Sequence, residues 1–291
     1  MESSGLPRLI SACINRLGVQ VAASPMVKRL IPPPVRRWVW AQQRSLSISP
    51  PLGRVAFRKL RRVTPVSRIF GFDRGLPIDR YYIEEFLSNN RCDIRGRVLE
   101  IAENKYTRMF GDERVDQSDV LHVCEGNPEA TIVTDLASAS AIESDSFDSL
   151  IVTQTLHLIF ELRPTILTLH RILKPGGVLL ATVPGISQIS RYDMDRWGDY
   201  WRFTTLTARK LFEEVFSTSD VEIQSYGNVL VANALLQGLA VEDLRRDELE
   251  YHDDDYELLI GIRAVKREDS KGSRATSNVW AGRAALRDDH I

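Results

Sequence analysis

Short apolar runs alternate with segments of helical periodicity between residues 66 and 267. Strands are predicted at residues 98–101, 119–123, 131–133, 147–153, 178–183, 221–226 and 256–265. Helices are predicted around residues 83–87 and at 106–110, 163–173 and 207–216, with Thr205 or Thr207 as the N-cap of the last one. Strands that alternate with helices form mostly parallel sheets covered on both faces. The pattern therefore predicts an α/β protein with a doubly wound, Rossmann-like, mostly parallel seven-stranded sheet.

The composition divides the chain into three parts. Residues 1–65 form a basic arm, in which prolines at 32–34 and 50–51 separate short helical pieces. Residues 66–267 contain the alternating elements and are predicted to form one domain. Residues 268–291 are polar and lack periodicity, which predicts a disordered tail.

The charge is distributed unevenly along the chain. Residues 1–70 contain 13 Lys and Arg residues against one acid, a net charge of +12, while the whole chain carries −1. The remaining 221 residues therefore carry −13. Such an arm is expected to meet an anionic surface. That surface can be the acidic body of its own molecule or of a homodimer partner, a membrane, or a glycosyltransferase complex; nucleic acid ranks lower.

Several classes of protein are excluded or disfavoured by composition. No apolar run approaches the ~18–20 residues needed to cross a bilayer, and the N-terminus lacks the pattern of a secretory signal. The three cysteines have no metal-ligand spacing and cannot all pair. We therefore expect a cytoplasmic protein, either free or peripheral at the inner face of the membrane.

Acidic residues follow three of the predicted strands. Glu100 ends the first strand, Glu125 follows the second and Asp135 follows the third. Because the carboxyl ends of parallel strands meet at one edge of a sheet, these acids are expected to line one ligand site. Carboxylates suit the hydroxyls and amino group of a nucleoside, with Glu125 on the ribose and Asp135 with Leu136 on the base. No glycine-rich cradle for a pyrophosphate is present.

The order of these features resembles the class I S-adenosylmethionine-dependent methyltransferases. The resemblance rests on the acid that closes the first strand, the acid of the second, Asp135-Leu136 before the fourth, and the Leu-Lys-Pro-Gly-Gly run at 173–177. Segments 74–82, 153–156, 184–185 and 197–204 resemble more closely bacterial methyltransferase-domain proteins found with glycosyltransferases or in surface-glycan and natural-product clusters. The similarity covers roughly residues 66–267.

The resemblance implies S-adenosyl-L-methionine as the cofactor. The residues that it places around the cofactor are Glu100, Ala102, Glu125, Asp135, Leu136, Thr153 and Thr155. One position departs from the family pattern, because the glycine-rich turn after the first strand reads Ala102-Glu103-Asn104-Lys105. Glycine is favoured in such a turn where the backbone approaches a ligand or takes a positive φ. The alternative is therefore a degenerate relative that keeps the fold and serves as a binding or assembly module.

Methyl transfer to a hydroxyl requires that the acceptor be positioned and its proton removed. His157, just after the fourth strand, is the first candidate for the general base, because an ordinary histidine accepts a proton near neutral pH. Asp193 is the reserve candidate. The alternative for His157 is a structural histidine at a helix start. No spacing of histidines and carboxylates indicates a metal site.

The acceptor is expected to meet two segments rich in aromatic and charged residues. The lid, residues 187–204, follows the fifth predicted strand, and the turn-rich segment 70–82 precedes the domain's first helix. The candidate substrate-binding residues are Asp79, Tyr81, Arg196, Trp197, Tyr200 and Arg202. Aromatic faces with acids and arginines favour a sugar, glycan or glycosylated small molecule, so O-methylation is the leading hypothesis. The Asn/Asp-Pro-Pro-aromatic signature of enzymes that methylate base amino groups is absent, which disfavours a nucleic-acid substrate.

Overall fold

The computed structural model describes residues 61–138 and 141–267. The chain divides into two units, Met1–Val63 and Thr64–Ile291, and every element described below belongs to the second. The predicted helical pieces of the arm before residue 61 and the tail at 268–291 lie outside the described residues.

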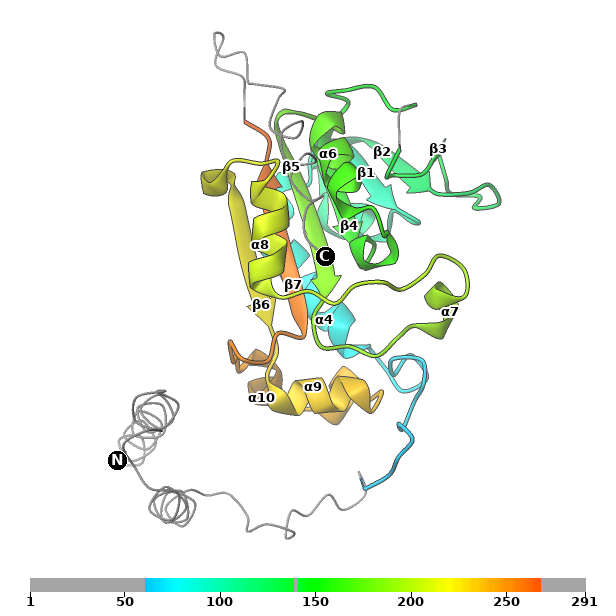
Figure 1. The fold of residues 1–291 in the computed structure, drawn as a ribbon, viewed down its shortest axis with the longest axis vertical. Coiled ribbons are helices and arrows are strands. Elements are labelled where there is room, and N and C mark those ends of the chain that lie inside the picture. Colours follow the sequence, from blue (N-terminus) through cyan, green and yellow to red (C-terminus); the bar gives the residue numbers. More distant parts are fainter. Residues whose placement is uncertain (1–60, 139–140, 268–291) are drawn as a thin grey trace, which may run out of the picture. The chain divides into compact units, whose positions relative to one another are not determined.

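A seven-stranded sheet forms the centre of the second unit (Figure 1). Its strands are β1 (Gly96–Ile101), β2 (Val115–His122), β3 (Ile132–Val133), β4 (Phe147–Thr153), β5 (Leu173–Pro184), β6 (Val221–Tyr226) and β7 (Leu259–Val265). The helices are α4 (Ile78–Asn89), α5 (Lys105–Phe110), α6 (Leu162–Ile172), α7 (Arg191–Met194), α8 (Thr205–Glu213), α9 (Val229–Leu236) and α10 (Arg246–Glu250). Short 3₁₀ turns join some of them, including Leu156–Leu158 after β4.

The strand order is β3-β2-β1-β4-β5-β7-β6, and β7 alone runs antiparallel to its neighbours. The sequence order reverses between β1 and β4, so the chain leaves β1 towards one edge of the sheet and returns through β4 towards the other. Ligands of doubly wound sheets bind at such a switch point, beyond the carboxyl ends of the strands. The predicted fold class is confirmed.

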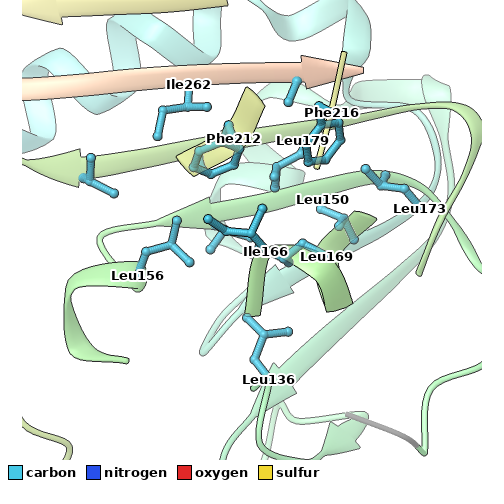
Figure 2. Close-up of a cluster of buried hydrophobic side chains, with 14 of the residues drawn as sticks. Leu136, Leu150, Leu156, Ile166, Leu169, Leu173, Leu179, Phe212, Phe216 and Ile262 are labelled. Atoms are coloured by element: carbon cyan, nitrogen blue, oxygen red, sulfur yellow. The ribbon is translucent and has the colours of Figure 1, made fainter. Parts of the chain in front are cut away.

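Adjacent residues of the central strands face opposite sides of the sheet, as the period of a strand requires. Leu150 and Leu179 belong to one core, whereas their neighbours Ile151 and Leu180 belong to the other. The first core is covered by α6 and α8, and Figure 2 shows its side chains, among them Ile166, Leu169, Phe212 and Phe216. The second core is covered by α4, α9 and α10. Strands buried on both faces explain the continuous apolar runs in the sequence.

Several boundaries differ from the sequence predictions. Strand β5 begins at Leu173, directly after α6, so Lys-Pro-Gly-Gly lies at the start of the strand instead of in a separate link. Helix α8 is capped by Thr204, whose hydroxyl accepts from the Thr207 backbone N–H at 3.2 Å; this is one residue before Thr205 and three before Thr207, the two predicted N-cap positions. Helices α9 and α10 were not predicted. Within the described residues, no helix is both long and apolar enough to span a bilayer.

Leu169 and Leu167 on α6 provide a matched test of the first core. Leu169 is fully buried, whereas Leu167 is 54% exposed two residues away on the same helix. Leu169→Ala leaves a cavity beneath the helix and is expected to lower the free energy of unfolding by about 3 kcal/mol. Leu167→Ala is expected to change it by less than about 0.5 kcal/mol. Urea unfolding of both variants measures the difference, and equal effects would contradict the packing described for α6.

Candidate active site

A cavity of about 1070 Å³ lies at the carboxyl ends of the central strands. Residues at the ends of β1, β2, β4 and β5 contribute to its wall, together with the start of α4, the turn after β4 and the lid. Of the fifteen residues proposed from the sequence, thirteen line it: Asp79, Glu100, Ala102, Asp135, Leu136, Thr153, Thr155, His157, Asp193, Arg196, Trp197, Tyr200 and Arg202. Glu125 and Tyr81 do not.

Glu100, the acid at the end of β1, is buried and turned back into its own chain. Its Oε1 accepts from the Tyr106 backbone N–H at 3.1 Å, and Oε2 accepts from the backbone N–H and hydroxyl of Thr107 at 2.7 and 2.8 Å. These are N–H groups of the first turn of α5, which have no partner inside the helix. Burial raises the pKa of Glu100, and the hydrogen bonds from Tyr106 and Thr107 oppose that rise. Glu100 therefore organises one wall of the cavity.

Ala102 occupies the turn in which the sequence departs from a glycine pattern. Its φ is 71°, in the left-handed region that favours glycine. The turn is fixed by a bond from the Ala102 N–H to the Leu121 carbonyl at 2.9 Å and by the Asn127 amide, which donates to the Ala102 carbonyl at 2.6 Å. Ala102 thus adopts a backbone conformation that normally favours glycine, and its side chain does not close the cavity that it lines.

Asp135 and Leu136 lie where the sequence predicted them. Asp135 is exposed in the cavity, and its Oδ1 accepts from the Ala137 N–H at 2.9 Å. That bond fixes the carboxylate while its second oxygen makes no hydrogen bond with the described residues. Leu136 is buried and supplies an apolar contact at the same place. Thr153 ends β4 and Thr155 follows it, with the Thr155 hydroxyl donating to the Thr153 carbonyl at 3.0 Å.

Glu125 is not brought to the cavity with the other predicted residues, because it is exposed and does not line the wall. Strand β2 ends at His122, and the chain has left the sheet before it reaches Glu125. His122 occupies the strand end instead, and its ring meets Trp197 edge-on with centroids 5.8 Å apart. The correct strand end would have indicated His122 from the sequence.

His157 is 93% buried at the back of the cavity, in the 3₁₀ turn after β4. Its Nδ1 has no hydrogen-bond partner among the described residues. Burial lowers the pKa of His157 to about 4, while the charges of Asp199 and Asp193 raise it and that of Arg202 lowers it. The ring is therefore neutral at neutral pH. Among the described residues, no group of three or more His, Cys, Asp or Glu side chains is arranged to hold a metal ion.

Arg202, a predicted substrate residue, lines the cavity but is committed to the lid. Its guanidinium pairs with both oxygens of Asp199 and donates to the carbonyls of Ser187, Gln188 and Trp201. These bonds use all five N–H donors of an arginine. Arg202 therefore holds the lid together, and the expectation that it binds substrate is corrected.

The remaining lid residues keep free faces in the cavity. Trp197 and Tyr200 are 36% and 51% exposed. Gly198 between them has φ 93°, and a Cβ there would lie 2.4 Å from the Tyr200 ring, so both the backbone and the space favour glycine. Arg196 lies 3.6 Å from the centroid of the Tyr192 ring. The Asp193 carboxylate makes no hydrogen bond or ion pair with the described residues.

The start of α4 contributes Asp79 and Arg80. The Asp79 carboxylate accepts from the Arg80 N–H at 2.9 Å, and burial raises its pKa. Arg80 donates to the Tyr106 hydroxyl at 3.0 Å and was not assigned from the sequence, although it follows Asp79 directly. Tyr81 does not line the cavity, since it lies on another side of the helix and meets Tyr82 edge-on at 5.2 Å.

One family model and a set of solved structures resemble this chain. Residues 91–181 match the family model described as a methyltransferase domain. A SAM-dependent methyltransferase from Archaeoglobus fulgidus is 14% identical, with 64% of this chain and 94% of that chain covered and a TM-score of 0.44.

A second solved structure is a phosphoethanolamine N-methyltransferase from Haemonchus contortus in complex with phosphomonomethylethanolamine and S-adenosylhomocysteine. It is 15% identical, with 65% of this chain and 57% of that chain covered and a TM-score of 0.42. None of the curated proteins matches the chain.

Ala102→Gly tests the backbone strain beside the cavity. Glycine removes the steric cost of the left-handed conformation. Part of this gain is lost because glycine also raises the conformational entropy of the unfolded chain. We therefore expect the free energy of unfolding to increase by about 0.5–1 kcal/mol. Ala130→Gly is the control, because the φ of Ala130 is not positive and glycine there is expected to lower stability by about 0.5–1 kcal/mol. Urea unfolding measures the stability of both variants, and a loss of stability in Ala102→Gly would show that the backbone at Ala102 is not strained.

The buried His157 ring predicts a pH-dependent stability. The unfolded chain binds a proton at an ordinary histidine pKa of about 6.5, whereas the folded protein does so only near 4. This group therefore leaves stability unchanged above the unfolded pKa, and stability falls as the pH decreases from about 6.5 towards 4. Between neutral pH and about pH 5, wild type should lose about 2 kcal/mol more than His157→Gln. Equal losses in urea unfolding at the two pH values would contradict a buried neutral ring.

Proposed function

We propose that the protein is an S-adenosylmethionine-dependent methyltransferase that methylates a hydroxyl of a sugar, a glycan or a glycosylated small molecule. The single observation that carries this proposal is that one cavity holds both halves of such a site. Ala102 and Asp135, which follow strand ends, line it together with His157, whose buried ring nitrogen has no partner among the described residues. The match of residues 91–181 to a methyltransferase domain supports the same reaction class.

The strand-end residues fit a nucleoside donor. Asp135 has a carboxylate oxygen available for an amino group or hydroxyl, and Leu136 offers an apolar surface for a base. Arg80, fixed by Tyr106, is the cation in this part of the wall and suits the carboxylate of the methionine moiety. When bound, S-adenosylmethionine supplies a methyl group activated by its sulfonium.

The lid fits a sugar-like acceptor. Trp197 and Tyr200 present exposed aromatic faces to the cavity, and the half-buried Asp193 carboxylate has no partner among the described residues. An aromatic face beside a carboxylate can hold a ring that is apolar on its faces and hydroxylated on its edge. Binding at the lid would place a hydroxyl in the same cavity as His157, and positioning is the main contribution to this kind of transfer.

His157 is the candidate that receives the acceptor proton. A neutral imidazole can accept a hydrogen bond from a hydroxyl, and its buried Nδ1 lacks any other partner among the described residues. Burial makes it a weak base, because its pKa is about 4, and the nearby charges of Asp199 and Asp193 partly restore its basicity. Proton transfer to His157 is therefore expected late, when the hydroxyl has become acidic by bonding to the methyl group.

A second candidate function is a binding or assembly module that retains the fold without transferring a methyl group. The positive φ of Ala102 favours it, since the alanine methyl occupies a turn where the family pattern has none. In that case the basic arm, residues 1–65, would carry the association with a membrane or a glycosyltransferase complex.

Calorimetric titration with S-adenosylmethionine tests the proposal, with two acids as a matched pair. Asp135→Asn removes a charged hydrogen-bond acceptor from the cavity and is expected to weaken binding about tenfold or more. Glu125→Gln changes an exposed acid outside the cavity and should leave the affinity unchanged. If folded wild-type protein binds no S-adenosylmethionine, the methyltransferase proposal is wrong and the binding or assembly module remains as the candidate function.

The acceptor half is tested on the same preparations with labelled S-adenosylmethionine and a panel of sugars, nucleotide-linked sugars and glycosides. His157→Gln should bind the donor with the affinity of wild type. Its rate of methyl transfer should be lower by a factor of about one hundred or more. Loss of donor affinity in this variant would instead assign His157 a structural role.

A further inference from the structure

A second pocket, of about 380 Å³, opens on the α4 side of the molecule near the end of β6. Its wall combines residues of α4, the last four residues of β6 with Ile223 as the first of them, and the segment that leaves α10. Figure 1 shows α10 beside the end of β6 at which the chain turns towards α9. The volume is within the range of small-molecule sites. No residue of this pocket lines the cavity of the candidate active site.

Tyr226 supplies the first indication of a ligand. Its side chain is 95% buried and lines the pocket, yet its hydroxyl has no hydrogen-bond partner among the described residues. The neighbouring Tyr82 differs in this respect, because its hydroxyl donates to the Leu249 carbonyl at 2.8 Å. Buried hydroxyls normally find a partner, since burial without one is unfavourable. The Tyr226 oxygen is therefore a vacant acceptor in the wall.

Glu85 supplies the second indication. It is half-buried in the wall and makes no hydrogen bond or ion pair with the described residues. Burial and the charge of Glu250 raise its pKa, and its charge in turn raises the pKa of Tyr226. A partly buried carboxylate without a cation is unfavourable for the folded chain. Glu85 and Tyr226 thus offer two acceptors to one ligand.

The remaining lining fits a positive charge. Its ionisable residues, apart from tyrosines, are three acids and one histidine, with no Lys or Arg among the described residues of the wall. Of the two other acids, Glu250 is paired with Arg246 and Asp254 with His252, both at the exposed rim. The Tyr82 and Tyr226 rings lie 5.5 Å apart and Tyr251 lines the rim. Tyrosine faces beside carboxylates are a favourable environment for organic cations.

We infer that this pocket binds an alkylammonium group, which donates N–H bonds to Glu85 and to the Tyr226 oxygen. An ammonium group has three donors and no acceptor, which complements two acceptors in an acidic wall. Metal ions fit less well, because the described residues contain no group of three metal-ligating side chains. A free amine and a lysine side chain carry the same group, and the experiment separates them.

The test is calorimetric titration of the full chain with n-butylammonium chloride at physiological salt. Wild type should bind the probe. The affinity of Glu85→Gln should be lower by a factor of about ten or more, and that of Tyr226→Phe should be severalfold lower. Glu84→Gln is the matched control, because Glu84 is the adjacent acid of α4, pairs with Lys105 at 3.4 Å and does not line the pocket. Its affinity should equal that of wild type, and a loss equal to that of Glu85→Gln would overturn the site.

Ligand variants keep the test independent of the folding of the protein variants. Tetramethylammonium has the charge without N–H donors and n-butanol has the chain without the charge, so both should bind wild type more weakly than butylammonium. Absence of butylammonium binding at millimolar concentration, or equal binding of all three probes, would overturn the inference. Tighter binding of N-acetyl-lysine methylamide than of butylammonium identifies a lysine side chain as the natural group, and the reverse order identifies a free amine.

Discussion

The carboxylate of Glu100 is the interaction on which the candidate site depends. Helix α5 begins only four residues after β1 ends, and its N-cap residue, Asn104, makes no side-chain capping bond. Glu100 takes over that role and accepts the N–H groups of Tyr106 and Thr107. Charge-assisted hydrogen bonds to backbone N–H groups are strong, and here they oppose the larger cost of burying the carboxylate. The strand, the turn with Ala102 and the helix therefore form one fixed corner.

That corner also positions residues of another element. The bonds of Glu100 set the place of Tyr106, and the Tyr106 hydroxyl accepts from Arg80 at the start of α4. Arg80 is thus held against the wall of the cavity by a chain of contacts that begins at a strand end. An acid at the end of a first strand would commonly be assigned to direct ligand contact. Here its oxygens accept hydrogen bonds from the protein itself, and they organise the wall of the cavity.

Sequence reasoning located the strand ends well and the orientation of side chains less well. The positions of Glu100, Asp135 and His157 follow from the pattern of buried strands, because parallel strands end at a common edge. Glu125 lies outside the cavity because β2 ends at His122, and in a connecting segment a few residues change which side chain meets the cavity. Tyr81 lies outside it for a related reason, because successive positions of a helix point in different directions.

Arg202 shows a limit of another kind. Arg202 lines the cavity as the sequence predicted, but its five donors are taken by Asp199 and by three carbonyls of the lid. Composition cannot tell an arginine that binds substrate from one that closes a loop on itself, because both require the same residue beside the same acid. Only the geometry of the donors separates the two roles.

Hydrogen bonds also connect the lid to the segment that carries His157, the candidate base. The His157 carbonyl accepts from the backbone N–H of Tyr200 at 2.9 Å, and the Trp201 indole donates to the Ile159 carbonyl at 3.1 Å. The aromatic residues that face the cavity and the imidazole that would receive a proton therefore belong to one hydrogen-bonded backbone unit. Because main-chain bonds fix the distance between them, exposed lid side chains such as Trp197 can vary and change which acceptor is held without moving His157. In the proposed enzyme, acceptor choice and proton transfer would thereby be separable properties of one cavity.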